Sequence, residues 1–427
     1  MKRLKELVKK VRKSPELSRK FFFVLFIFLV CRLLAHIPVP LIDSSQLRMF
    51  VQASQFLGIL NVFSGGTLSN FSVVALGVGP YISASIVLQL AGLVLPKLKE
   101  LQQEGERGRT RINQYTRYLA FPLAAVQSVS IIALLRTNNL LMTDNIWAWV
   151  AIAVILMAGS FLMVWLGELI SRYGIGNGVS MIMTLGIVSQ MPSMVAQTMA
   201  VTTTSQLFGM ILLVVMIVAV IALVAFINAA VRQVPVQYAK RVRGSRTFGG
   251  QSTFLPIRVN STGVLPVIFA MTLMSIPGFL GQVMAGFENQ FWSSLGANLV
   301  SWFSTSSPVY LVVTFVATFI FTFLSSILLF DADHLAEELK KSGAFVPGIR
   351  PGEKTKLFLK AIVKNLTLAE ATFLSGIALL PFILGAITGV GQIAIGGTSI
   401  MILVSVILET VKQIEGQTVG QNYDKYL

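Results

Sequence analysis

Cysteine, histidine and charged residues are all scarce in this chain of 427 residues. Its single cysteine, Cys31, excludes an intrachain disulfide bond, and two histidines are too few for a metal-binding cluster of His and Cys. Charged residues make up only 12% of the chain and hydrophobic residues 54%, whereas about 25% of the residues in a soluble globular protein are charged. The composition therefore excludes a soluble globular protein and indicates a chain that crosses a membrane several times.

Nucleotide-binding motifs are also missing. Neither GxxxxGKS nor GxxxxGKT occurs, and the glycines of YGIGNGVS at 173–180 lack the GxGxxG spacing and follow a predicted membrane span rather than a strand. We expect no nucleotide site, so that the energy for any transport comes from a partner protein or a gradient.

Ten apolar stretches are long enough to span a membrane, which takes about 20 apolar residues. Before the first of them, residues 1–20 combine nine basic residues with leucine and valine at helical spacing, which predicts an amphipathic helix on the membrane surface. The predicted spans lie near 21–37, 77–95, 118–135, 148–170, 178–198, 207–230, 261–283, 308–330, 368–388 and 394–412.

The basic residues are distributed unevenly between the loops that join these spans. If the amino end lies inside, 31 of the 34 Lys and Arg residues fall in inner segments. The two largest inner loops are 231–260 and 331–366. Cytoplasmic loops of membrane proteins carry such an excess of basic residues. The pattern predicts that both ends of the chain, including the tail 413–427, lie in the cytosol.

The predicted spans divide into two halves of five, residues 21–198 and 199–412. An odd number of spans per half makes the halves run in opposite directions, as in the inverted repeats of many transporters. An ion-coupled transporter also needs ionisable groups at membrane depth, but Glu168 and Glu370 fall near predicted inner ends, where we expect water to reach them. Arg32 lies beyond the middle of the first span, and we expect it to snorkel to the outer face or to bond to neighbouring helix ends.

The stretch from 61 to 96 has a polar, glycine-rich first part and an apolar second part. The first part is too short and too interrupted to cross a membrane. Backbone that is not paired within a helix is tolerated at membrane depth only where protein buries it or water reaches it. The break therefore predicts a cavity within the bundle.

Five motifs spread along the chain match one known pattern. They are SGGTLSNFSVVALGVGPYISAS at 64–85, EGERGRTRINQYTRY at 104–118, RYGIGNGVSMIM at 172–183, LKKSGAFVPGIRPGEKT at 339–355 and IGGTSIMILV at 395–404. Together they resemble the SecY family, the channel subunits of the bacterial protein-export translocon and their Sec61-alpha relatives. The loop between the sixth and seventh spans departs from the pattern, and resembles the family only through YAKR at 238–241 and its LPI ending.

The resemblance implies an all-helical channel for unfolded polypeptide. Its ten spans would surround a central pore, with a re-entrant plug helix on the outer side and a ring of apolar side chains at the waist. Residues four apart share a helix face, so that such a ring can draw two side chains from one helix. The ring implied by the resemblance comes from PYISASI at 80–86, SMIMTLGI at 180–187, PVIFA at 266–270 and SIMIL at 399–403, and consists of Ile82, Ile86, Met183, Ile187, Ile268 and Ile402. The implied plug covers about 61–72 and includes Asn61, Phe63, Gly65, Gly66, Leu68, Asn70 and Phe71.

The resemblance also implies a lateral gate, through which hydrophobic segments reach the lipid. It would lie between spans two and three on one side and spans seven and eight on the other, and Gln89 in the second span is a candidate for a hydrogen bond across it. A channel of this kind is not an enzyme and holds no cofactor.

Partners follow from the same resemblance. It implies SecE, SecG, the SecA motor and the ribosome as partners, secretory and membrane proteins as substrates, and the bacterial inner membrane as the location. Arg350 in GAFVPGIRPG can make bidentate contacts with a carboxylate or a ribosomal RNA phosphate. Lys240, Arg241 and Arg243 in the other large loop are further docking candidates. Two alternatives remain open, an ion-coupled secondary transporter and a membrane insertase scaffold without a continuous pore.

Overall fold

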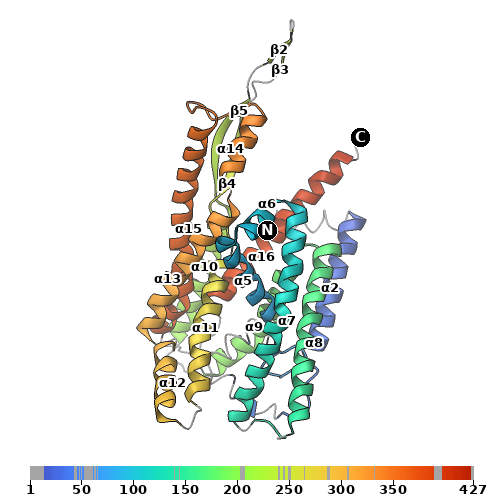
Figure 1. The fold of residues 1–427 in the computed structure, drawn as a ribbon, viewed down its shortest axis with the longest axis vertical. Helices are drawn as coiled ribbons and strands as arrows, with labels where there is room; N and C mark the ends of the chain where they lie inside the picture. The colour runs from blue at the N-terminus through green and yellow to red at the C-terminus, as the bar shows by residue number, and fades with distance from the viewer. Residues whose placement is uncertain are drawn as a thin grey trace.

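The fold is mostly helical, with small sheets at one end of a helix bundle (Figure 1). Most of its long helices run roughly along the long axis of the molecule. The computed structural model describes residues 14–42, 46–47, 49, 51, 61, 64, 66–138, 140–143, 145–201, 207–238, 241–243, 246–248, 252–263, 265–285, 289–304, 307–330, 332–388 and 397–424.

One group of helices comes from the first half of the chain. In this group α7 packs against α5 and α8, and α8 packs against α2 and α9. Its helices are α2 (Pro15–Leu34), α5 (Gly79–Val94), α6 (Pro96–Gln103), α7 (Glu106–Thr137), α8 (Ile146–Tyr173) and α9 (Gly178–Val201).

A second group comes from the rest of the chain. Here α13 packs against α11 and α15, while α16 packs against α10 and α15. Contact between α9 and α16 joins the two groups, and Figure 1 shows these two helices between α7 and α8 on one side and α13 and α15 on the other. The helices of this group are α10 (Leu207–Ala229), α11 (Leu265–Ala285), α12 (Gln290–Trp302), α13 (Pro308–Leu329), α14 (Ala332–Lys341), α15 (Glu353–Thr388) and α16 (Gly397–Asp424).

Polar side chains fix where several of these helices begin. Asn145 accepts a hydrogen bond from the Trp147 amide, and Asn289 does the same for Phe291. Such an N-cap satisfies one of the amides that the first turn of a helix leaves unpaired. Ser307 caps α13 in the same way, with proline at the first helical position, where the missing N–H costs nothing.

Among the described residues, five helices are long and apolar enough to cross a membrane. These segments confirm a membrane protein with several spans, and they coincide with five of the predicted ones. They are Thr110–Arg136, Ile146–Tyr173, Leu265–Gln282, Pro308–Ser326 and Glu353–Leu380.

Some predicted boundaries differ from the helix ends. The predicted surface helix 1–20 and the first span meet within one continuous helix, α2, which starts at Pro15, while residues 1–13 lie outside the described residues. Helix α15 likewise starts at Glu353, well inside the predicted loop 331–366. Polar residues continue these helices beyond the apolar stretches, so hydropathy alone places the boundary too late.

The all-helical prediction needs one addition, because the two large inner loops form strands. Strands β1 (Val231–Tyr238) and β4 (Ser252–Arg258) are antiparallel, and β5 (Ala344–Phe345) adds to the other edge of β1. Val234 and Val236 are buried while their neighbours are exposed, which is the alternation of a strand with one covered face. A separate pair, β2 (Arg241–Arg243) and β3 (Arg246–Phe248), forms the tip of the hairpin.

The sheet packs against α14 and α15 through a small apolar cluster that includes Val234, Ile257, Ala336, Val346 and Leu359. This cluster draws on both large inner loops. The two loops, far apart in the sequence, therefore form one unit at the end of the bundle.

An ion-pair group fastens α14 to α15. The Asp333 carboxylate lies 3.0 Å from Lys356 Nζ and 3.3 Å from Lys360 Nζ. Hydrogen bonding to Lys356, and then to Lys360, holds the pKa of Asp333 below its ordinary value.

We predict that acid loosens this attachment. A carboxyl group whose pKa is lowered by folding stabilises the fold above its unfolded pKa, and that contribution is lost as the pH falls through the lowered, folded value. The hydrogen-exchange protection factors of α14, which correct for the slower intrinsic exchange in acid, should therefore fall below that pKa, and Asp333→Asn should lower them already at neutral pH. The effect should be small because the pairs are exposed to solvent. Glu337→Gln is the matched control, since Glu337 pairs with Lys341 on its own helix. Equal exchange in both variants would contradict the assignment.

Candidate functional site

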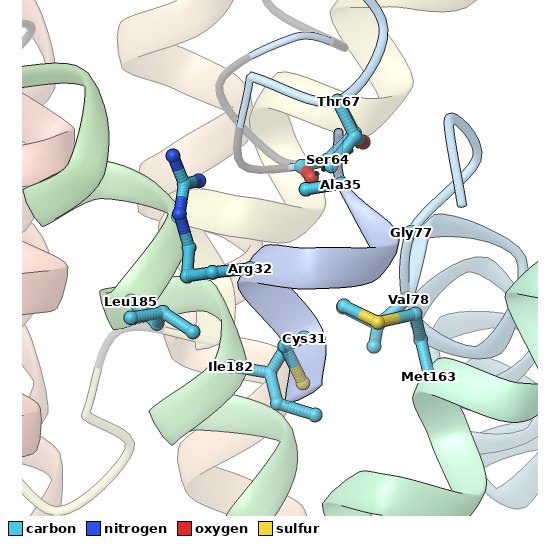
Figure 2. A pocket seen from close by; sticks show the side chains of 11 residues that line it. Cys31, Arg32, Ala35, Ser64, Thr67, Gly77, Val78, Met163, Ile182 and Leu185 are labelled. Atoms are coloured by element: carbon cyan, nitrogen blue, oxygen red, sulfur yellow. Dashed lines mark hydrogen bonds between the residues drawn. The ribbon is translucent and has the colours of Figure 1, made fainter. Parts of the chain in front are cut away.

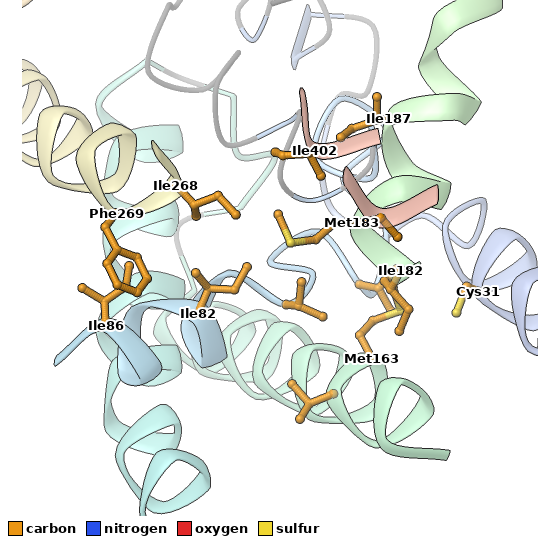
Figure 3. Close-up of a cluster of buried hydrophobic side chains, with 14 of the residues drawn as sticks. Cys31, Ile82, Ile86, Met163, Ile182, Met183, Ile187, Ile268, Phe269 and Ile402 are labelled. Carbon is orange, nitrogen blue, oxygen red and sulfur yellow. The ribbon is translucent and has the colours of Figure 1, made fainter. Parts of the chain in front are cut away.

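The six predicted ring residues lie in one buried hydrophobic cluster. They come from α5, α9, α11 and α16, which are far apart in the sequence. Figure 3 shows Ile82, Met183, Ile268 and Ile402 pointing toward one another from these four helices. Each of the six side chains is at most 9% exposed. Whether this cluster is the waist of a pore remains a prediction, but the structure does bring its members together.

Helix geometry places the ring side chains in pairs. Ile82 and Ile86 are one turn apart on α5, and Met183 and Ile187 are one turn apart on α9, so each pair shares a face. The cluster also holds Phe269, whose ring meets the Phe321 ring edge-on across α11 and α13 at 6.1 Å between centroids. Aromatic packing between α11 and α13 thus belongs to the same buried cluster as the six predicted ring residues.

The predicted plug, about 61–72, is described only in part: Asn61 is helical, and the residues between it and Ser64 lie outside the described residues. Among the described residues, Ser64 and Gly66–Val78 follow successive turns rather than a helix. Gly66 and Gly77 have φ values of +81° and +54°, and Phe71 has +40°, a region that suits glycine and strains other residues. Phe63 and Gly65 lie outside the described residues.

Short polar side chains replace the missing helical hydrogen bonds in this segment. The Thr67 hydroxyl lies 2.8 Å from the Ser64 carbonyl oxygen and 3.0 Å from that of Val74, and the Asn61 side chain accepts a hydrogen bond from the Ser69 amide. Such local bonds compete with helix formation. Leu68 and Phe71 are buried in a second cluster with the ends of α7 and α8, while Asn70 is half-buried.

A cavity lies between the plug segment and the first group of helices (Figure 2). Its lining includes Arg32, Ser64, Thr67 and Met163. The Arg32 guanidinium donates a hydrogen bond of 2.8 Å to the Ser189 hydroxyl on α9. Arg32 thus has a partner on the middle part of a neighbouring helix rather than at a helix end, and snorkelling stays a prediction. A serine partner leaves no charge pattern, so no feature of the sequence indicates it.

The predicted gate residue, Gln89, is half-buried on α5. A different glutamine links the second and third predicted spans: Gln127 on α7 donates to the Ser83 hydroxyl on α5 at 3.3 Å. The sequence does not indicate this contact, because a glutamine in a membrane helix can bond to many kinds of neighbour.

The expectation that water reaches Glu370 is wrong, since this side chain is only 1% exposed. Its carboxylate accepts hydrogen bonds from the Thr262 amide, at 2.9 Å, and from the Thr262 hydroxyl. The loop between β4 and α11 folds back over α15, and the carboxylate pairs with an amide just ahead of α11, where a negative charge is favourable. Asn260 in the same loop donates to Asn228 on α10.

The candidate docking loop presents Arg350 to solvent. Gly348 and Gly352 flank it with φ values of +81° and +101°, and the Thr355 hydroxyl donates to the Arg350 carbonyl oxygen at 2.9 Å. The loop therefore has a defined shape that holds one exposed guanidinium. Arg241 and Arg243 lie on β2 in the other loop, and Lys240 falls outside the described residues.

Comparison with known proteins decides the family. The family model described as SecY matches residues 72–411. The "Protein translocase subunit SecY" of Streptomyces scabiei is 37% identical over 436 residues, covering 97% of this chain and 98% of the relative. The chain belongs to the SecY family. A SecY of Mycobacterium tuberculosis (strain ATCC 25618 / H37Rv) is 36% identical over 440 residues, with the same coverage of this chain.

Solved structures of SecY-type channels share the fold. One described as "The structure of a protein conducting channel" has a TM-score of 0.63 and 16% identity, and covers 94% of this chain and 93% of that one. Another, "Sec61 in the Canine ribosome-channel complex from the endoplasmic reticulum", has a TM-score of 0.62 and 16% identity, with the same coverage. At this identity the likeness concerns the SecY fold alone.

Proposed function

We propose that this chain is the protein-conducting channel of a Sec translocon, passing unfolded secretory proteins across the membrane and releasing hydrophobic segments to lipid through a lateral gate. The observation that carries the proposal is the convergence of six apolar side chains from four helices into one buried cluster, next to a segment of turns. A hydrophobic constriction of this kind excludes water and ions until it is widened. The family match does not favour the secondary transporter or the insertase scaffold.

In this proposal the chain spans the bacterial inner membrane ten times. Residues 21–198 and 199–412 form two inverted halves around the pore, and the plug covers about 61–72. The lateral gate opens between α5 and α7 on one side and α11 and α13 on the other. Five apolar helices that coincide with predicted spans support the arrangement.

Partners in this proposal dock on the unit formed by the two inner loops. SecE and SecG associate within the membrane, and SecA or a ribosome binds the inner face. Support for a ribosome comes from relatives of known structure, since one is a canine Sec61 ribosome-channel complex and another a yeast Ssh1 complex bound to the 80S ribosome. The exposed arginine on its shaped loop supports docking of a carboxylate or phosphate.

The test is transport itself. The chain, purified with the membrane partners that accompany it, is reconstituted in vesicles with SecA, ATP and a secretory precursor. We expect the precursor to become protected from added protease. No protection above the level of vesicles lacking the chain would contradict the proposed function.

Topology provides an independent prediction. The bias of basic residues toward the predicted inner loops supports a cytosolic location for both ends, so a reporter joined after Tyr426 should report the cytoplasm. A reporter inserted beside Asn289, at the start of α12, should report the outside. The opposite labels would contradict the map.

A further inference from the structure

The segment Ser72–Val78, which we name the plug root, joins the plug to α5. It is among the most buried parts of the chain, because Ser72 and Val74 are fully buried and Val78 is 1% exposed. The Val73 amide donates to the Ile37 carbonyl oxygen at 3.0 Å, which ties the root to the chain that follows α2. The root is therefore fixed by backbone contacts rather than by side chains alone.

Two adjacent residues of α8 form the seat on which this root rests. A Cβ atom added to Gly159 would lie 1.9 Å from the Val73 carbonyl oxygen and 2.7 Å from its carbon. Only glycine lets the two backbones approach so closely. The neighbouring Ser160 is 2% exposed, and its hydroxyl donates to the Gly77 carbonyl oxygen at 2.9 Å.

The plug front, by which we mean the part near Asn61 and Gly66, is held differently, by one long side chain. Gln190 on α9 donates from Nε2 to the Asn61 carbonyl oxygen at 3.0 Å. A Cβ atom added to Gly66 would meet the same glutamine at 3.1 Å. The front thus rests against a flexible side chain that can move away, whereas the root rests against helix backbone that cannot.

We propose that Gly159 and Ser160 are positioning residues that fix the plug root to α8, and that Gln190 is a latch that holds the plug front closed. The plug then swings about its root rather than leaving as a free loop. The inference rests on the proposed function, in which this segment closes the channel.

Helix α9 connects the latch to the constriction. Gln190 follows the ring residue Ile187 by three positions, so both lie on neighbouring parts of one helix face. A displacement of α9 that widens the ring moves the latch with it. Widening of the ring and release of the plug front are therefore coupled through one rigid helix.

Plug exposure tests the assignment directly. In a Cys31→Ser background, Ser69→Cys provides a single thiol in the plug, and its reaction with a bulky water-soluble maleimide is measured per assembled channel in vesicles. We expect Gly159→Ala, Ser160→Ala and Gln190→Leu each to raise the labelling rate, about fivefold or more for Gly159→Ala. Gly376→Ala is the matched control, since a Cβ atom there meets open space, and its rate should equal that of the parent.

The outcomes separate this inference from the proposed function. Labelling rates equal to the control in Ser160→Ala and Gln190→Leu would overturn the inference, even if Gly159→Ala fails to assemble. Thermal stability of each channel is measured alongside, because a merely structural defect lowers it without raising plug labelling in channels that remain assembled. Precursor transport is measured separately in the same vesicles. A parental chain that transports no precursor would refute the proposed function, and the labelling rates would still show whether Gly159 and Ser160 hold the plug root.

Discussion

Replacing Ile402 by asparagine should make the closed channel leak ions. Ile402 is 3% exposed and lies in the ring cluster, where a buried amide without a partner costs about 1–3 kcal/mol. Water that enters the constriction hydrates the amide and removes that cost. The population of water-filled, conducting channels therefore rises. We expect ion conductance of reconstituted membranes to rise about tenfold, equivalent to about 1.4 kcal/mol in the balance between closed and conducting channels.

A control on the same helix separates wetting from general damage. Ile400 is equally buried on α16 but packs in a different cluster, with α10 and α15. Ile400→Asn therefore carries the same cost of burying an amide without reaching the ring. A leak in Ile400→Asn as large as in Ile402→Asn, or unchanged conductance in both Ile402→Asn and Ile86→Asn, would refute the ring.

The same substitution should also relax the demands on the transported protein. A signal sequence opens a channel only by as much as it binds the open state better than the closed one. Because Ile402→Asn raises the open population beforehand, a precursor with a weakened signal should be transported better by this variant than by the parent.

Arg350→Glu should abolish motor-driven transport while the channel still assembles. A charge-assisted hydrogen bond contributes about 1.5–3 kcal/mol, and the reversed charge adds repulsion from any acidic or phosphate partner. We expect SecA-dependent transport of a precursor to fall below about one tenth of the parental rate. The exposed position of Arg350 means that folding and association with SecE should be unchanged.

Lys354→Glu is the control for this prediction. Lys354 is exposed on the first turn of α15, close to Arg350 in sequence. Lys354→Glu therefore changes the net charge by the same amount as Arg350→Glu, and in the same region. Lys356 would be a poor control, because it pairs with Asp333 and its loss would loosen α14. Transport by Arg350→Glu at the parental rate, with equal channel content, would rule out docking through this arginine.

The members of this buried cluster could be named from the sequence because the family resemblance points to short motifs on each of the four helices. Spacing along a helix then shows which of the side chains share a face, while their role as a ring stays a prediction. The sequence also indicates the break before α5, where glycine, serine and threonine interrupt the apolar run. What the motifs could not give is the partner of any polar side chain at depth.

The remaining features depend on contacts between distant parts of the chain. The burial of Glu370 depends on Thr262, 108 residues away, and Gly159 is significant only because Val73 crosses it. The strands were missed for another reason. Their alternating pattern in VRQVPVQY is short and contains a proline, which normally weakens a strand prediction.

The three-stranded sheet connects the two large inner loops to three helices of the bundle. Strand β1 continues from α10 almost without a break, β4 leads within a few residues into α11, and β5 precedes α15. Rows of backbone hydrogen bonds join β1 to both of its neighbours in this sheet. In the proposed function, a partner that binds this sheet therefore contacts one hydrogen-bonded unit that leads into three helices, and one of them, α11, carries Ile268.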